Sequence, residues 1–546
     1  MPTALELLRE DRIEELWQKC CGFIDLSMEQ FMAIQHERLL EQIETLKKCE
    51  LGNKLIGGAN PRTVEEFRQR VPLTTYADYI PYLSEKMDDT LPGKPIMWNR
   101  TSGRSDEYSF KWVPTTRRMY EELGDTFLSL LVFASCRDRG DIVLEEHDKF
   151  LYGLAPPPYA SGFWGRRAEE EGIFKFLPHP DVADKMEFRE RMEAGFKLGM
   201  SEGIDMMAAI ASVLVAVGER FGQGGGLNRL IPVLKQPKIL MRLVKAMLKS
   251  KMARRHLLPK DIWSLKGLVS AGTDSYVYRE KIKEMWGRYP LDVYGATETV
   301  LIAAQTWDYG SMTFFPYFSF LEFIPEKEHA KWAKDTKYQP QILQLDEVMA
   351  GERYIVVATN FLGGSFVRYV LGDVLTITSL RNDKLNINQP QATFYGRADD
   401  IIDFEAFSHA FFTEKIVWQA IANSGFNYVD WVVRKEVIQE TPMLHLYVEP
   451  KEPEFNDEAG LTSLLHEELK RLNPDYDDLE RFFGLKPLKV TLLRGGAFEE
   501  YMAKKREAGA DLAHLKPPHM KPSDSIIEAL GAKSQMAPTP SPMSLT

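Results

Sequence analysis

Two short apolar runs, each ending at a glycine, lie in the middle of the chain: residues 265–273 read LKGLVSAGT and residues 291–299 read LDVYGATET. Both are typical of a buried β-strand that leads into a tight turn. In the second run, Tyr294 can stack on a purine, Thr297 can bond a phosphate and Glu298 can bind Mg²⁺. The simpler alternative is a turn whose hydroxyl and carboxylate cap a following helix.

A loop rich in hydroxyl side chains lies upstream. Residues 101–114 read TSGRSDEYSFKWVP, and the surrounding sequence predicts a strand on each side. Such a loop can turn backbone N–H groups and hydroxyls toward phosphate oxygens, whose charge Lys111 can offset. Because clusters of Ser, Thr and Gly are also common in plain turns, the segment alone leaves both interpretations open.

Two further segments place an acid beside a turn. Residues 366–375 read FVRYVLGDVL, where Asp373 can accept hydrogen bonds from ribose hydroxyls or can simply belong to a hairpin turn. Residues 394–404 read FYGRADDIIDF, where Arg397 can pair with a phosphate or a ribose and Asp399 can act as a hinge. The alternative for this second segment is a surface turn with an internal ion pair.

A lysine near the C-terminus stands before two prolines. Residues 495–521 read GGAFEEYMAKKREAGADLAHLKPPHMK, and the lysine of the Lys-Pro-Pro sequence is Lys516. Prolines restrict the backbone that follows, which predicts that Lys516 lies on an ordered loop. An isolated lysine is usually only a surface residue, so its significance depends on the other motifs.

Apolar spacing divides the chain into helical and β-type regions. Residues 1–70 repeat apolar side chains every three or four positions, which predicts amphipathic helices. A helix-rich region is expected at about 182–250, and the run MMAAIASVLVAV at 206–217 is expected to be a buried helix within it. From 262 to 400, short β-type runs alternate with turns.

The sequence therefore predicts an α/β fold with a large N-terminal part and a smaller C-terminal part. Strand and helix alternate again after about residue 400, and the last stretch is rich in Pro and Ser and is expected to be disordered. We expect an N-terminal domain at 1–398, a small mobile α+β domain at 399–532 and a disordered tail at 533–546.

Composition excludes several classes of protein. The 546 residues carry a net charge of −11, which disfavours general binding to nucleic acid. The longest apolar run is shorter than the ~20 residues of a transmembrane helix, so no integral membrane segment is expected. The N-terminus does not resemble a secretory signal, and the four cysteines form no CxxC pair. We therefore expect a cytoplasmic location.

Several familiar motifs do not occur. The sequence holds no GxxxxGK[ST] phosphate loop and no GxSxG nucleophile elbow, and its ten histidines lack the spacing of metal ligands. A basic, apolar stretch at 240–260, LMRLVKAMLKSKMARRHLLPK, predicts a helix. Its cations fit either a solvated helix face or a surface that docks on an anionic membrane.

Taken in order, the five segments resemble the adenylate-forming superfamily, and more closely the auxin-responsive promoter (Gretchen Hagen) family of acyl-acid amido synthetases, in a bacterial-type member. The resemblance extends from about residue 60 to 532 and is strongest in the ordered set VSAGT, VYGATE, VRYVLGDVL, FYGRADDII, GAFEEY and HLKPP. It implies a large adenylate-forming domain, with mixed sheets, a β-barrel-like part and helices, followed by the small mobile domain.

The resemblance also implies the roles of individual residues. Glu298 would bind Mg²⁺ and act in catalysis with Thr297, Lys516 would be the mobile catalytic lysine, and Asp399 would be the hinge. ATP would be bound by the following residues: Thr101, Ser102, Gly103, Ser105, Lys111, Ser270, Ala271, Gly272, Thr273, Tyr294, Gly295, Asp373 and Arg397.

The phosphate loop departs from the family pattern. Arg104 stands where the family usually has a threonine, and Asp106 and Glu107 replace glycine. Two acids beside a triphosphate require compensation by Arg104, Lys111 or Mg²⁺.

The resemblance implies an AMP-forming ligase that uses ATP and Mg²⁺. The enzyme would convert an apolar or aromatic carboxylic acid to an acyl-adenylate and transfer the acyl group to an amine or amino acid. Two alternatives stay open: transfer to coenzyme A, which is less favoured, and a catalytically degenerate protein that binds nucleotide or acyl groups.

Overall fold

The structure of the protein is a computed structural model. It describes residues 2–101, 111–186, 188–222, 237–271, 275–335, 337–398, 400, 402–403, 411–438, 441–452, 454–473, 476–477, 480, 486–507 and 518–532.

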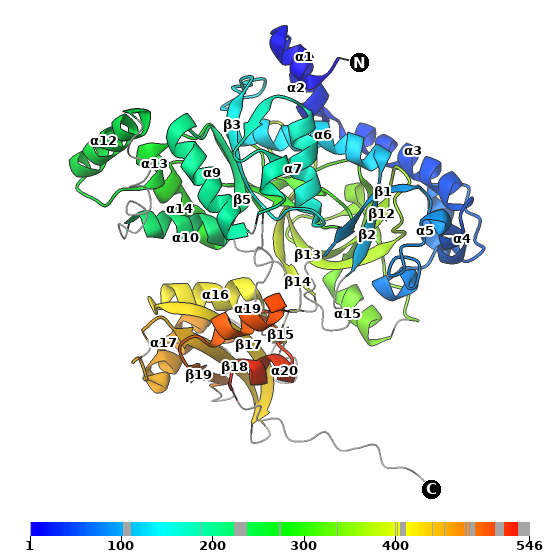
Figure 1. The fold of residues 1–546 in the computed structure, drawn as a ribbon. Coiled ribbons are helices and arrows are strands. Elements are labelled where there is room, and N and C mark those ends of the chain that lie inside the picture. The colour runs from blue at the N-terminus through cyan, green and yellow to red at the C-terminus, as the bar shows by residue number, and fades with distance from the viewer. Residues whose placement is uncertain are drawn as a thin grey trace. The chain divides into compact units, whose positions relative to one another are not determined.

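The chain forms two compact units, and the division between them falls between Tyr395 and Gly396 (Figure 1). We call the described residues up to Tyr395 the first unit and those from Gly396 the second unit. The predicted domain limits at 398 and 532, and the functions assigned to the parts, stay predictions.

The first unit begins with the amphipathic helices that the sequence predicts. They are α1 (Ala4–Arg9), α2 (Ile13–Cys21), α3 (Met28–Leu46), α4 (Glu50–Ile56) and α5 (Val64–Arg70). Helix α3 begins at a capping box, in which the Ser27 hydroxyl accepts from the Gln30 N–H at 3.2 Å and the Gln30 side chain accepts from the Ser27 N–H. Its apolar face, which includes Phe31, Leu39 and Ile43, lies in the core.

A twelve-stranded mixed sheet organises the first unit, in the order β11-β10-β12-β13-β14-β9-β8-β7-β6-β5-β3-β4. Its strands are β3 (Asp148–Gly153), β4 (Phe174–Phe176), β5 (Met206–Ile210), β6 (Gly267–Ala271), β7 (Leu291–Tyr294), β8 (Ala303–Ala304), β9 (Met312–Phe314), β10 (Ser319–Pro325), β11 (Leu343–Gln344), β12 (Arg353–Asn360), β13 (Tyr369–Ser379) and β14 (Gln391–Arg397). Strands β4, β3, β5, β6 and β7 pair in parallel, whereas β8 pairs antiparallel with β7 and with β9. The strand pairing in the sheet therefore changes from parallel to antiparallel directly after β7, which ends at Tyr294.

Helices cover both faces of the parallel strands. They are α6 (Arg117–Ser135), α7 (Ala160–Glu170), α8 (Pro180–Ala183), α9 (Phe188–Glu202), α10 (Ala211–Gly222), α13 (Pro259–Ile262) and α14 (Ser275–Trp286). Helix α12 (Pro237–Met252) packs against α9 and α13, and α15 (Glu326–Lys334) packs against β10 and β12. Figure 1 shows α9, α10 and α14 together on one flank, while α6 packs against β6. A separate hairpin of β1 (Pro95–Arg100) and β2 (Trp112–Thr116) completes the unit and supplies the strand–loop–strand pattern expected there.

The prediction of one helix over residues 206–217 is wrong in its first half. Residues Met206–Ile210 form strand β5, and the helix begins only at Ala211. Met206 and Ala208 face one apolar cluster while Met207 and Ala209 face the other. A parallel strand buried on both faces is a continuous apolar run, which residue periodicity cannot distinguish from a buried helix.

The second unit is built on a three-stranded sheet in the order β17-β18-β19. Its elements are β15 (Ile402–Asp403), β16 (Phe411–Phe412), α16 (Glu414–Asn423), β17 (Tyr428–Ile438), β18 (Thr441–Pro450), α17 (Glu458–Leu472), β19 (Leu488–Leu492), α19 (Ala497–Glu507) and α20 (Asp524–Ala529). Strands β17 and β18 form a long antiparallel hairpin, and β19 pairs parallel with β18. None of the helices in the described part of the chain has the length and apolar character needed to cross a bilayer.

A buried ion pair joins three segments of the first unit that are distant in sequence. Arg368 and Glu322 are only 3% and 0% exposed, and the guanidinium donates two hydrogen bonds to the carboxylate, at 2.9 and 2.8 Å. The remaining nitrogen of Arg368 donates to the carbonyl oxygens of Arg68 and Val71 at the end of α5. The pair therefore ties β10 to the start of β13 and to the N-terminal helices.

We predict that Glu322→Gln destabilises the first unit by about 3–5 kcal/mol, because it leaves a buried guanidinium without its counter-charge. The free energy of unfolding in urea measures the effect. Glu347→Gln is the matched control, since Glu347 is 41% exposed and pairs with Arg68 at 2.9 Å. Glu347→Gln should lower the free energy of unfolding by less than about 1 kcal/mol. Equal losses of stability in the two variants would contradict the role of the buried pair.

Candidate functional site

Two of the predicted site residues meet through a direct hydrogen bond. Tyr294 ends β7, and its hydroxyl donates to Oδ2 of Asp373 in β13 at 3.0 Å. The Tyr294 ring is 6% exposed and packs against Phe394 of β14 at 5.8 Å between ring centroids. The fold thus brings together two motifs that lie 79 residues apart.

A bulge in strand β13 places Asp373. Gly372 has φ of 77°, which favours glycine, and the pairing of β13 with β12 shifts register between Ile355 and Val357. The strand continues through this point to Ser379. The alternative of a hairpin turn at Asp373 is therefore wrong, since a β-bulge redirects side chains without ending a strand.

The turn after β7 is closed by backbone hydrogen bonds. The Ala296 carbonyl accepts from the N–H groups of Thr299 at 3.1 Å and Val300 at 2.8 Å. A Cβ on Gly295 would overlap the carbonyl oxygen of Val300, so the turn requires glycine. The chain then enters β8, not a helix, which means that the alternative of a helix cap at these residues is wrong. Thr297, in the same turn, is half-buried.

Glu298 and Lys111 approach each other through a tyrosine that the sequence interpretation missed. The Tyr369 hydroxyl donates to Oε1 of Glu298, and Nζ of Lys111 donates to the same hydroxyl, both at 3.5 Å. The Glu298 carbonyl accepts from Nδ2 of Asn360 at 2.9 Å. Tyr369 stands in the VRYVLGDVL motif, and that position was the only available signal for it.

Thr101 and Lys111 close the base of the predicted phosphate loop. The Thr101 N–H donates to the Lys111 carbonyl at 3.0 Å, and the Lys111 N–H donates to the Thr101 hydroxyl at 3.2 Å. The side chain of Lys111 also lies 5.3 Å from the ring centroid of Tyr76. Ser102, Gly103 and Ser105 lie outside the described residues.

Ser270 and Ala271 end strand β6, between β5 and β7. In the register of the parallel strands, Ala271 lies beside Ile210 on one side and Val293 on the other, and Ser270 is 1% exposed. The carboxyl ends of these strands therefore meet at the edge that carries Tyr294 and Gly295. This is where ligands bind in open α/β sheets. Gly272 and Thr273 lie outside the described residues.

Of the remaining predicted site residues, the structure describes only Arg397, in the second unit. Arg397 ends β14 and is half-buried. Asp399 and Lys516 lie outside the described residues. The described chain resumes at Pro518, two residues after Lys516.

A buried histidine anchors the segment that follows Lys516. Nδ1 and Nε2 of His519 lie 2.6 Å from Glu414 and 2.8 Å from Asp430, and the ring stacks on Trp431 at 4.4 Å between centroids. The backbone on both sides of Met520 also pairs with Val433 of β17. The chain after Lys516 is therefore fixed to the central sheet of the second unit.

Two carboxylates keep His519 charged. Burial by itself lowers the pKa of His519, but the charge of Asp430 and the hydrogen bonds to Asp430 and Glu414 outweigh that effect and raise the pKa to about 9, from an ordinary value of 6.5. Because the pKa is higher in the folded protein, the stabilisation is complete below about pH 6.5 and is lost as the pH rises through 9.

We therefore predict that the second unit loses about 3 kcal/mol of stability between pH 6.5 and pH 9 through His519. His519→Gln should remove this pH dependence, whereas His256→Gln, at an exposed histidine, should keep it. Urea unfolding followed by tryptophan fluorescence at several pH values measures it. The same pH profile in His519→Gln and in the unchanged protein would refute the assignment.

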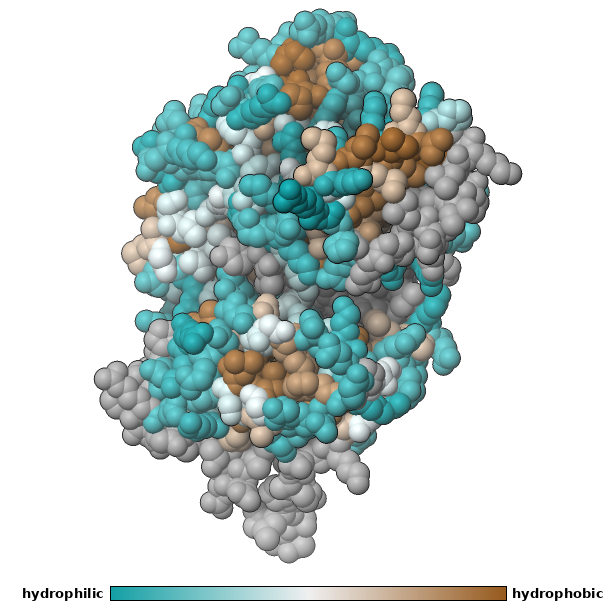
Figure 2. All heavy atoms as spheres, turned by 90° about the vertical axis from the view of Figure 1, so that its left-hand side faces the viewer, coloured by the Kyte–Doolittle hydropathy of each residue, from teal (hydrophilic) through white to brown (hydrophobic). Residues whose placement is uncertain are grey.

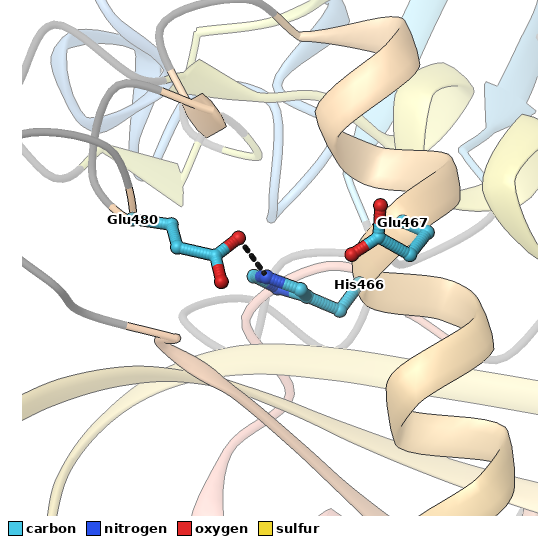
Figure 3. Close-up of side chains that lie close together, drawn as sticks. All are labelled: His466, Glu467 and Glu480. Atoms are coloured by element: carbon cyan, nitrogen blue, oxygen red, sulfur yellow. Dashed lines mark hydrogen bonds and ion pairs between the residues drawn. The ribbon is translucent and has the colours of Figure 1, made fainter.

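A cluster of His466, Glu467 and Glu480 has the spacing of a metal site, with ligand atoms within 4.8 Å of one another (Figure 3). The Glu480 carboxylate, however, already accepts hydrogen bonds from Lys470 at 2.7 Å and Lys486 at 2.8 Å. These hydrogen bonds hold the pKa of Glu480 well below its usual range. Two ammonium groups on one carboxylate oppose the binding of a cation, so we interpret the cluster as an ion-pair network that links α17 to Glu480 and Lys486.

Three segments of the chain match sequence models of one protein family. The GH3 family N-terminal domain matches residues 20–143, the central domain 312–397 and the C-terminal domain 413–524. This chain belongs to the GH3 family. The predicted resemblance is confirmed, and the central-domain match includes Tyr369, Asp373 and Arg397.

Curated relatives of this GH3 chain come from plants. Indole-3-acetic acid-amido synthetase GH3.3 of Arabidopsis thaliana is 24% identical over 237 residues, which is 41% of this chain and 37% of the relative. Probable indole-3-acetic acid-amido synthetase GH3.2 of Oryza sativa subsp. japonica is 22% identical over 240 residues, with the same coverage. The chain thus spans a little over one third of the length of these relatives.

Solved structures match most of the GH3 chain in fold. AtGH3.15 acyl acid amido synthetase in complex with 2,4-DB matches with a TM-score of 0.66 and 17% identity, covering 95% of this chain and 98% of that one. A 2-hydroxyisobutyryl-CoA ligase in the postadenylation state matches with a TM-score of 0.58 and 13% identity, covering 94% and 93%. The predicted α/β fold of the adenylate-forming type, with a separate C-terminal part, is confirmed.

Proposed function

We propose that this chain is an ATP-dependent acyl acid amido synthetase. It would activate an apolar or aromatic carboxylic acid as an acyl-adenylate and then transfer the acyl group to an amine or amino acid. The observation that carries the proposal is the contact of Tyr294 with Asp373 at the carboxyl edge of the parallel strands, in a chain of the GH3 family. The names of its relatives and its similarity in fold to AtGH3.15 support it.

The chemistry of a carboxylate explains why ATP is needed. A carboxylate resists nucleophilic attack because it is negatively charged and its oxygen is a poor leaving group. When the carboxylate oxygen attacks the α-phosphate of ATP, pyrophosphate leaves and the acid becomes an acyl-adenylate, from which AMP leaves readily. An amine then attacks the acyl carbon, and the C–N bond forms as the bond to AMP breaks.

The first unit offers groups for binding the nucleotide. In our proposal Asp373 accepts hydrogen bonds from the ribose, and Tyr294 holds that carboxylate by its 3.0 Å hydrogen bond and borders the adenine. Gly295 and Thr297 in the turn after β7 would approach the α-phosphate. The loop closed by Thr101 and Lys111 and the end of β6 would contact the remaining phosphates and the adenine, through Ser102, Gly103, Ser105, Ser270, Ala271, Gly272 and Thr273.

Glu298 is our candidate ligand for Mg²⁺. Its oxygens are hard donors of the kind that Mg²⁺ binds, one of them accepts only a long hydrogen bond from Tyr369, and Mg²⁺ commonly combines one carboxylate with phosphate oxygens. Bound there, the ion would neutralise charge on the phosphates. Lys111, which reaches the same tyrosine, would add a second positive charge against the phosphates.

The second unit supplies the mobile groups in this proposal. Residues 1–398 would bind ATP and the acid, and residues 399–532 would reorient about Asp399 between the two half-reactions. Lys516 would stabilise the charge that develops during adenylation, and Arg397 would support the ribose. We propose a cytoplasmic enzyme whose partners are the small-molecule acid and the amine, with no nucleic acid.

Carboxylate-dependent exchange of pyrophosphate into ATP tests the function. A panel of aromatic and aliphatic acids should include some that support exchange, and mass spectrometry should then find amides when amino acids are added. Thioester products with coenzyme A in place of amides would favour the CoA-ligase alternative. ATP binding without exchange for any acid would instead identify a degenerate nucleotide-binding protein.

We predict that Asp373→Asn lowers kcat/KM for ATP in this exchange by about 10–100-fold, the value of a hydrogen bond to a charged group. Tyr294→Phe keeps the ring but loses the hydroxyl that holds Asp373. It should therefore lower kcat/KM for ATP by a smaller factor, about tenfold. Glu347→Gln, at an exposed carboxylate of the same unit, is the control and should leave the rate unchanged. An unaltered KM for ATP in Asp373→Asn would exclude the ribose role.

Lys516→Ala should reduce the exchange rate by at least about 100-fold while ATP affinity changes little, because the lysine acts on charge that develops in the transition state. Isothermal titration with ATP separates the two effects. Lys521→Ala, five residues later in the same segment, is the matched control. Equal exchange rates in Lys516→Ala and in the unchanged protein would rule out the assignment.

A further inference from the structure

Helix α12 is packed on only one side. Ile239, Leu243 and Ala246 are buried in an apolar cluster that includes Trp263 and Trp286. Figure 1 shows the helix at the outer end of the first unit. The packing of one side fixes the orientation of the helix, and with it the side that faces outward.

The outward side of α12 carries large apolar side chains. The exposed fractions are 51% for Leu240, 57% for Met241, 47% for Val244, 55% for Met247, 57% for Leu248 and 85% for Met252. With about 100° of rotation per residue, these six side chains span an arc of about 140°. In Figure 2 apolar side chains gather in one patch over this end of the first unit. A contiguous apolar patch of this kind usually marks an interaction surface.

Cations flank this apolar face. Lys238, Lys245 and Lys249 lie along one border of the arc, Lys251 lies within it, and Arg254 follows the helix; all five are exposed. Among the described residues, none of them pairs with a carboxylate. The sixteen residues of α12 include no Asp or Glu, although the whole chain has a net charge of −11. The local charge is therefore positive.

One further cation of α12 has a structural role. Arg242 donates to the carbonyl oxygens of Gly199 at 2.8 Å and Met200 at 2.7 Å, near the C-terminal end of α9. It satisfies carbonyl groups that a helix end leaves without partners. In the described part of the chain, the exposed lysines of α12 make no comparable hydrogen bonds to a helix end.

We propose that the outward face of α12 docks on an anionic lipid surface. The helix would lie in the plane of the membrane, with its apolar arc in the boundary between head groups and acyl chains and its lysines against the lipid phosphates. Sixteen residues make a helix about 24 Å long, and its apolar arc suits this parallel orientation. Long lysine side chains can keep their charge at the head groups while their carbon atoms cover apolar surface.

The positive charge of this face favours an anionic membrane over a second copy of the chain as its binding partner. Two copies of the same face would bring their lysines together without acids from α12 to compensate, which is unfavourable. An anionic membrane provides the opposite charge and an apolar layer directly below it. The proposal does not depend on the enzymatic activity proposed above, because docking is measured without any reaction.

Co-sedimentation of the full chain with vesicles tests the proposal. Vesicles of phosphatidylcholine with about one third phosphatidylserine should bind the protein, and binding should weaken as salt is raised. Vesicles of phosphatidylcholine alone should bind at least about tenfold less, since each lysine near an anionic surface contributes roughly a fivefold gain in affinity.

Variants separate the apolar and the charged contributions. Met241→Glu/Leu248→Glu should weaken binding to the anionic vesicles by more than tenfold, because it places two negative charges within the apolar arc. Lys245→Glu/Lys249→Glu should weaken binding similarly and reduce its salt dependence, since it reverses two of the five exposed cations. The matched control is Met349→Glu, at another methionine that is 60% exposed, and it should bind like the unchanged protein.

Three results would overturn the proposal. One is failure of the unchanged protein to bind anionic vesicles. Another is equal binding by Met241→Glu/Leu248→Glu, with circular dichroism showing that the variant is folded. The third is self-association in light scattering that this variant abolishes, without vesicle binding, because the face would then be a contact between copies of the chain.

Discussion

The buried pair of Arg368 with Glu322 is the interaction on which the first unit depends. The pair cannot be hydrated, so each charge needs the other, and the remaining guanidinium nitrogen satisfies two carbonyl groups near the end of α5. Tyr369 follows Arg368 directly, and Asp373 lies four residues further along the same strand. The pair therefore fixes the start of the strand that carries two side chains of the candidate site.

The site itself follows from a change of strand direction. Parallel strands end together at one edge, and the chain reverses from β7 into β8 through a turn that only glycine permits at position 295. The half-buried Thr297 and Glu298 lie in that turn, three and four residues after Tyr294, whose hydroxyl donates to Asp373. A rigid sheet thus positions polar groups on loops, an arrangement that supports chemistry on a bound ligand.

Prediction from sequence succeeded where a motif is local. The helices of residues 1–70, the strand–loop–strand around the predicted phosphate loop and the family resemblance needed only residue types and spacing. It failed at strand β5, because an apolar run carries no period when both faces are buried. Prediction also missed Tyr369, since a place in the VRYVLGDVL motif does not by itself distinguish a tyrosine that bridges Lys111 and Glu298 from one that fills the core.

The amino-acid sequence by itself determined the family and the α/β class and named the segments that hold candidate site residues, because these depend on patterns within short stretches of chain. Only the tertiary structure decided that Tyr294 holds Asp373, that Gly372 forms a bulge and not a hairpin, and that α12 exposes an apolar face. Each of these depends on which distant segment packs against a residue. Apolar packing and burial across the whole unit select the segment against which a residue packs, and the spacing of residues along the chain does not reveal which segment that is.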